Sequence, residues 1–198
     1  IGLPYSNQIA IDFEFYGEEG SNPKIVCLVA RDLVTGKVSQ YWQGELLKMA
    51  SPPFDTGGDS LIITFFASAE LQCFHALGWK PPQNILDLYA EFRCLTNGCD
   101  LPMGRSLLGA LALFGLDHIA PCQKEQMREL ILSGGPWPEY QRSSILAYCQ
   151  QDVDAPGPLL DAILARESWT VDRPGQALPR APWNSPPLLL RKSCHANV

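Results

Sequence analysis

The stretch Ile9–Phe15, IAIDFEF, decides the expected fold because it sets two acids into an apolar, β-rich run. Asp12 and Glu14 stand two residues apart, and side chains on a strand alternate between its faces. The spacing therefore predicts a strand with both carboxylates on one face and apolar side chains on the other. Two neighbouring anions on a half-buried strand repel each other and lose solvation. Salt bridges, a solvent-facing strand or a divalent cation would each compensate them, and the pair alone leaves these open.

The sequence around this stretch predicts a mixed sheet flanked by helices. Three strands with short connections come first, which is typical of an antiparallel meander. A buried strand at 61–66 then precedes a helix for which Ser68 is the expected N-cap, with Glu70 in the first turn. The other expected elements are strands at 24–31, 38–42 and 85–88, a short helix at 46–50, and helices at 106–114, 124–132 and 138–167, the last interrupted by Pro156 and Pro158.

Two further features, the Tyr148–Asp152 pair and Glu70, indicate a site only when their order along the chain is considered. Tyr148 and Asp152 stand four residues apart on the last expected helix, which places both on one helical face. Taken alone, this pair is more typical of a solvated face than of a site. Glu70, taken alone, is typical of an acid that complements the helix dipole.

Taken together, the ordered residues resemble a known family. An Asp-x-Glu on the first strand, an acid opening the helix after the fourth strand, and a late Tyr-x₃-Asp resemble the DEDD superfamily of 3′–5′ exonucleases, in the variant with tyrosine in its third motif. Over about residues 8–165 the chain is similar to the proofreading region of phage-type family A DNA polymerases. The segments that carry this similarity are ASAELQC (67–73), LGW (77–79), NILDLYAEFR (84–93), SLLGAL (106–111), GGP (134–136) and YCQQDVDA (148–155).

The resemblance implies an α/β, ribonuclease H-like fold: a five-stranded mixed sheet, with three antiparallel strands first, flanked by helices. It implies that two divalent cations, Mg²⁺ or Mn²⁺, are held by four acids and that a tyrosine positions the attacking water. The reaction would be two-metal-ion hydrolysis that releases nucleoside 5′-monophosphates from single-stranded DNA 3′ ends. The implied ligands are Asp12, Glu14, Glu70 and Asp152, and the implied tyrosine is Tyr148.

The resemblance leaves several alternatives open. The second motif of the family usually has Asp where this chain has Glu70, and Asp87 on the following strand is a rival for that role. A catalytically degenerate domain that binds nucleic acid or a polymerase partner is therefore the alternative to an enzyme. RNA 3′ ends also stay open as a substrate, and a polymerase domain or subunit as a partner.

Candidate substrate contacts flank the acids. Phe13, Phe15 and Tyr16 are candidates for stacking on a terminal base or sugar, although core packing is favoured for the two phenylalanines. Arg105 precedes the helix that begins near Ser106, so it is a candidate phosphate contact. A plain N-cap at Ser106 is the favoured alternative.

Composition excludes some classes of function. The net charge is −6, which argues against generic electrostatic capture of nucleic acid. Seven cysteines without a C-x-x-C are typical of a reduced, intracellular protein. The chain shows no apolar run of about 20 residues and no secretory signal, which predicts no membrane association. We expect a cytoplasmic location, in a bacterium or a phage-infected host cell.

Two further expectations concern a zinc set and the domain limits. Cys94, Cys99, His118 and Cys122 have wider spacing than zinc ribbons prefer, so unliganded thiols are expected. Residues 1–168 are the expected exonuclease domain. Residues 169–198 hold five Pro, four Lys or Arg and one acid, and are expected to form a poorly ordered tail. Because the first residue is Ile1 and not Met, the chain is expected to be a piece of a longer one.

Overall fold

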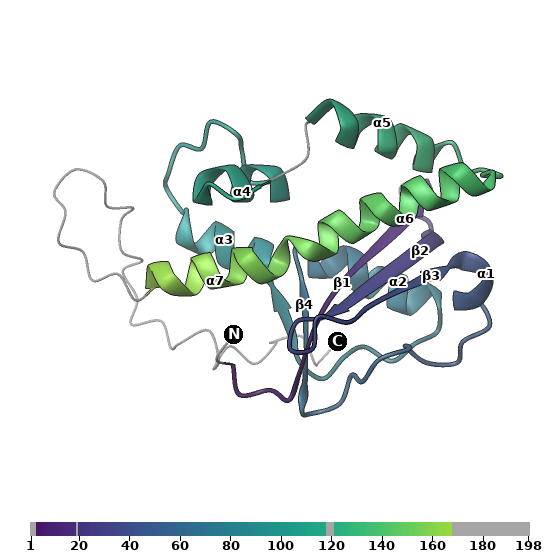
Figure 1. Ribbon diagram of the computed structural model, residues 1–198, viewed down its shortest axis with the longest axis horizontal. Helices are drawn as coiled ribbons and strands as arrows, with labels where there is room; N and C mark the ends of the chain where they lie inside the picture. Colours follow the sequence, from purple (N-terminus) through teal and green to yellow (C-terminus); the bar gives the residue numbers. More distant parts are fainter. Residues whose placement is uncertain (1–2, 19, 118–120, 168–198) are drawn as a thin grey trace, which may run out of the picture.

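The computed structural model describes residues 3–18, 20–117 and 121–167. Within these residues, five strands form one sheet in the order β3-β2-β1-β4-β5 (Figure 1). β1 pairs antiparallel with β2 and β2 with β3, whereas the β1–β4 and β4–β5 pairs are parallel. This is the sheet of a ribonuclease H-like fold, and the predicted fold class is confirmed. The strands are β1 (Asn7–Tyr16), β2 (Lys24–Asp32), β3 (Val38–Trp42), β4 (Ser60–Thr64) and β5 (Ile85–Asp87).

Seven helices within the described residues surround this sheet. They are α1 (Gln43–Leu46), α2 (Ala67–Ala76), α3 (Leu88–Leu95), α4 (Leu107–Phe114), α5 (Pro121–Leu132), α6 (Glu139–Asp154) and α7 (Pro156–Glu167). The interruption expected near Pro156 separates α6 from α7. The short early helix begins at Gln43, three residues before its expected start. None of the helices in this part of the chain is long and apolar enough to cross a membrane.

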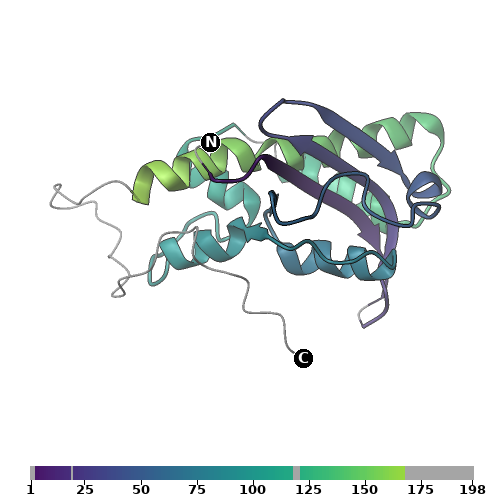
Figure 2. The same ribbon diagram turned by 90° about the horizontal axis from the view of Figure 1, so that it is seen from below.

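The alternation of β1 determines which helix covers which face of the sheet. Ile11 and Phe13 belong to a buried cluster with Phe74 of α2. Ala10, one position out of phase, belongs to a second cluster with Ile145 of α6. Figure 2 shows the sheet between the green α6 on one side and the blue-green α2 on the other. Asp12 and Glu14 share the phase of Ala10, so the predicted placement of both acids on one face is correct.

A third apolar cluster fixes the helices beyond the parallel edge of the sheet. Ile63 of β4 packs there with α3, α4 and α7. The buried helical members include Phe92, Leu111, Leu160 and Ile163. This cluster holds the start of α7 in place, and therefore also the end of α6, where Asp152 lies.

The expected N-cap at Ser68 is wrong. Helix α2 begins at Ala67, and its N-cap residue Phe66 makes no side-chain cap bond. Instead, Oδ2 of Asp87 accepts a hydrogen bond from the Ala67 backbone at 3.2 Å. Oδ1 of the same carboxylate accepts from the Tyr89 and Ala90 backbones at the start of α3. The parallel pairing of Thr64 with Asp87 brings the two helix starts together, which local sequence patterns do not reveal.

Some expectations fall on parts of the chain that are not described. The predicted tail at 169–198 and His118 lie outside the described residues. None of the described cysteines forms a disulfide. Cys94, Cys99 and Cys122 belong to no group of metal ligands within the described residues.

The first turn of α4 requires a residue without a side chain. A Cβ at Gly109 would lie 2.4 Å from the carbonyl oxygen of Gly104 and 2.6 Å from that of Met103. We therefore expect Gly109→Ala to lower the free energy of unfolding by about 1–3 kcal/mol in urea denaturation, because backbone atoms must move apart. Gly44→Ala in α1 is the control, since nothing lies within 4 Å of its Cβ. Equal losses in the two variants would contradict the prediction.

Candidate metal centre

Two carboxylates and one thiol form a compact cluster at the C-terminal half of β1. One ligand atom from each of Asp12, Glu14 and Cys149 lies within 4.8 Å of the others. Asp12 and Glu14 are partly buried and Cys149 is buried. The pairing of β1 with β2 is irregular between Glu14 and Phe15, and such irregularities often re-aim side chains beside active sites.

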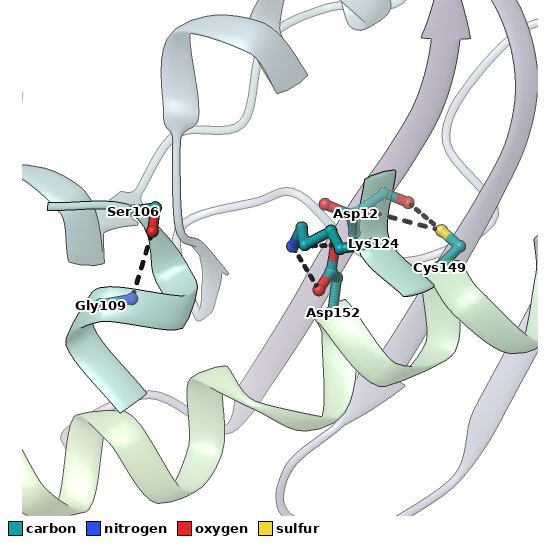
Figure 3. A network of polar contacts seen from close by, with 6 residues as sticks. All are labelled: Asp12, Ser106, Gly109, Lys124, Cys149 and Asp152. Atoms are coloured by element: carbon teal, nitrogen blue, oxygen red, sulfur yellow. Dashed lines mark hydrogen bonds and ion pairs between the residues drawn. The ribbon is translucent and has the colours of Figure 1, made fainter. Parts of the chain in front are cut away.

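The Cys149 thiol is a direct neighbour of Asp12. Its Sγ donates to the backbone oxygen of Asp12 at 3.2 Å and lies 3.3 Å from the carboxylate Oδ2 (Figure 3). Burial raises the pKa of this thiol well above its usual value, so it stays protonated and can donate. No local pattern reveals this contact, because β1 and α6 are separated by 137 residues at this point.

Glu70 reaches β1 from α2, the helix that follows β4. The register of β1 with β4 ends at Ala10 and Ile63, after which the chain enters α2. The Phe13 backbone N–H, beyond that end, donates to Oε2 of Glu70 at 3.0 Å. Glu70 is only 5% exposed. Its carboxylate pairs with the Phe13 backbone N–H and lies close enough to Asp12 for the two acids to repel each other.

Asp152 and Tyr148 reach the cluster from α6. Both oxygens of Asp152 accept hydrogen bonds from the Lys124 ammonium of α5, at 3.0 and 2.9 Å. The same ammonium lies 5.6 Å from the centre of the Tyr148 ring. Figure 3 shows Asp12 between the Lys124–Asp152 pair and Cys149. By its sequence pattern alone, Lys124 is a solvated helix residue or a DNA contact, and only the structure shows its pairing with Asp152.

The pKa values of Asp12, Glu14 and Glu70 show that their ionised forms are disfavoured in the folded chain. Burial, followed by repulsion from Asp152, raises the pKa of Asp12 to about 8. Burial and then repulsion from Asp12 raise the pKa of Glu14 and of Glu70 well above their usual values. Burial also raises the pKa of Tyr148, which keeps its hydroxyl protonated.

This donor set fits a hard divalent cation. One oxygen of Asp12 and one of Glu14 lie within 4.8 Å of each other, and a bound cation would offset the burial and repulsion that raise their pKa values. Carboxylate oxygens are the ligands that Mg²⁺ and Mn²⁺ prefer. Asp87, the rival candidate for the role of Glu70, accepts hydrogen bonds from three backbone N–H groups at the starts of α2 and α3.

A cavity of about 440 Å³ opens beside Asp152 and Lys124. Its walls are mainly apolar and include Leu107, Leu111 and Pro158. The cavity therefore joins an apolar space directly to the charged groups at the end of α6.

The candidate substrate contacts are mostly engaged elsewhere. Phe13 is 3% exposed and its ring packs edge-on against Phe74, so this side chain belongs to the core packing that the sequence favours. Phe15 also packs against the apolar core. The Tyr16 ring lies 5.9 Å from Trp137. The Arg105 guanidinium donates to the backbone oxygens of Thr96 and Cys99, which ties down the preceding loop and leaves its phosphate role unsupported.

The helix at Leu107 has the plain N-cap that the sequence favours. The Ser106 hydroxyl oxygen accepts a hydrogen bond from the Gly109 backbone at 3.2 Å (Figure 3). The helix ends at Gly115 with a φ of 66°. Both ends are therefore where the sequence pattern predicts them.

The raised pKa of Asp12 predicts how stability changes with pH. Between its ordinary value of 3.8 and its folded value of about 8, the folded chain holds a proton that the unfolded chain has lost. Stability must then fall as pH rises through this window. We expect a lower melting temperature at pH 8 than at pH 5 in EDTA, and a smaller difference in Asp12→Asn. A melting temperature that rises with pH equally in both proteins would contradict this.

Substitutions of Glu70 test whether its hydrogen bond to the Phe13 N–H stabilises the fold. Glu70→Ala leaves the buried Phe13 N–H without its partner, and such a loss costs about 1–3 kcal/mol. Glu70→Gln keeps a carbonyl oxygen for that bond and removes the buried charge. We expect Glu70→Ala, but not Glu70→Gln, to lower the free energy of unfolding in metal-free urea denaturation. Similar losses in both variants would contradict a stabilising role for the hydrogen bond to the Phe13 N–H.

A scan of protein-family models finds no match for this sequence, and a search of curated proteins finds no significant relative. Among solved structures, the chain is similar to the crystal structure of the Nibbler EXO domain from Aedes aegypti. The sequence identity is 12% and the TM-score is 0.39, over 81% of this chain and 82% of that chain. At this level the likeness carries no information about activity, which must be inferred from the acidic centre itself.

Proposed function

We propose that residues 1–168 form a metal-dependent 3′–5′ exonuclease domain that removes nucleoside 5′-monophosphates from single-stranded DNA. The observation that carries this proposal is the convergence of carboxylates from β1, α2 and α6 at one partly buried place, with a tyrosine beside them. Such a gathering of like charges is unfavourable unless cations or protons compensate it. Hydrolysis of a phosphodiester is a reaction for which paired divalent ions are suited.

Each acid has a proposed role. Asp12, Glu14, Glu70 and Asp152 would hold two Mg²⁺ or Mn²⁺ ions. When bound, these ions supply a hydroxide near neutral pH and stabilise the leaving 3′ oxygen. The Tyr148 hydroxyl, kept protonated by its raised pKa, would donate a hydrogen bond that orients the attacking water.

The apolar cavity beside Asp152 is the proposed place for the terminal nucleotide. Leu107, Leu111 and Pro158 would contact the base, while Asp152 lies at the charged end of the same space. The carboxylates do not select between deoxyribose and ribose, so RNA 3′ ends are the alternative substrate. The resembled enzymes act in proofreading, and we therefore propose a polymerase domain or subunit as the partner. Replicating DNA would place this activity in the cytoplasm of a bacterium or a phage-infected cell.

A specific observation favours a second candidate, a non-catalytic domain that binds nucleic acid or a polymerase. Glu70 already accepts a backbone hydrogen bond, and Asp152 is already neutralised by Lys124. A chain with these acids committed to structure would keep the fold without hydrolysis. It would show no metal-linked gain in stability.

The deciding experiment uses a 5′-labelled single-stranded DNA oligonucleotide. We expect the chain with Mn²⁺ to produce a ladder that shortens from the 3′ end, and EDTA to abolish it. Asp12→Ala should lower the rate at least about a hundredfold, because loss even of groups that only support metal ligands costs 10–100-fold. An RNA oligonucleotide of the same sequence measures the sugar preference.

Asp161→Ala is the matched control, since it removes an exposed carboxylate from α7 and should leave the rate unchanged. Equal rates in wild type, Asp12→Ala and Asp152→Ala would exclude the exonuclease. Absence of cleavage together with unchanged melting temperature in Mn²⁺ would favour the non-catalytic domain.

A further inference from the structure

Lys124 holds the acid that is expected to bind a metal ion. Its ammonium contacts both oxygens of Asp152, and it also lies over the ring of Tyr148. One lysine therefore engages both residues of the expected third motif. Within the described residues, Lys124 is also the one cation that forms a salt bridge with any of the four proposed metal ligands.

The Lys124–Asp152 pair is partly buried, which strengthens the attraction between its two charges. The Asp152 side chain is 15% exposed, so its attraction to the ammonium is only weakly screened by water. The positive charge also reaches Asp12, whose pKa it lowers against the larger effects of burial and of Asp152. Lys124 thus supplies part of the positive charge that this group of carboxylates lacks.

A divalent ion and the Lys124 ammonium cannot both bind the two carboxylate oxygens of Asp152. The two oxygens that would bind the ion are both hydrogen-bonded to Nζ, and two cations held a few ångströms apart repel each other strongly in a partly buried place. The lysine has a route out, because its side chain is 34% exposed and lies on a flexible four-carbon stem. It also lines the cavity beside α4 and α7, so open space lies next to its side chain.

We propose that Lys124 is an internal competitor for the divalent cation: it neutralises Asp152 in the metal-free chain and must leave when the ion binds. The inference rests on the metal centre of the proposed function. It adds that metal affinity is set by a residue on α5 that is not a ligand. Lys124 is accordingly a positioning residue, which holds Asp152 toward the cluster until the ion replaces it.

The test measures binding of Mn²⁺ alone to the full chain, without nucleic acid, by the electron paramagnetic resonance signal of free Mn²⁺. We expect Lys124→Met to tighten Mn²⁺ binding by about tenfold, a change within the range found for close charge pairs. Lys124→Arg keeps the cation and should stay near wild type. Lys124→Met should also lower the melting temperature in EDTA, because Asp152 then lacks its partner.

Arg128→Met is the matched control. Arg128 lies one turn further along α5 and is exposed, so its replacement removes the same charge from the same helix without touching Asp152. General electrostatics would tighten Mn²⁺ binding equally in both variants, whereas competition predicts a change in Lys124→Met that is several times larger. An equal effect, or none in Lys124→Met, would overturn the inference.

The same proteins separate this inference from the proposed function. If Lys124→Met binds Mn²⁺ more tightly but the wild-type chain does not shorten DNA, competition stands and the exonuclease fails. If the wild-type chain shortens DNA and the two methionine variants bind Mn²⁺ alike, the exonuclease stands and competition fails. If no variant binds Mn²⁺, both proposals fail.

Discussion

Mutual repulsion among its buried carboxylates limits how the acidic centre can be built. Asp12 and Glu14 share one face of β1, and two more acids reach them from α2 and α6. Burial by itself raises the pKa of Asp12, Glu14 and Glu70, and repulsion from neighbouring acids raises it further. A fold that gathers them must provide positive charge, protons or hydrogen bonds at the same place.

The sheet creates this place because its strands end at different points. β1 continues beyond the end of its pairing with β4, and the free backbone N–H of Phe13 takes Glu70 as its partner. The turn from β4 into α2 brings that acid to the strand. On the opposite face, the packing of Ile145 and Val153 against the sheet holds α6 so that Asp152 comes near Asp12. Apolar packing on both faces thus fixes the positions of the charged groups.

Three of the four acids are compensated by different chemical groups, and these groups differ in how easily they can be replaced. Glu70 accepts from the backbone, Asp12 contacts a thiol that stays protonated, and Asp152 pairs with a lysine that reaches solvent. The backbone bond is permanent as long as the fold persists. In the proposed metal centre, the lysine and the bound protons are the groups that a cation would replace.

Local sequence patterns are enough to predict the alternation of β1, the strand order of the meander, and the i, i+4 placement of Tyr148 and Asp152. Those features depend on backbone periodicity, which is a local property. The sequence does not reveal that Asp87 also accepts a hydrogen bond from the start of α2, that Cys149 contacts Asp12, or that Lys124 neutralises Asp152. Each of these contacts joins residues on separate elements, 20 to 137 positions apart. Only the tertiary structure decides them, because the packing of sheet and helices, and not any local pattern, sets which side chains meet.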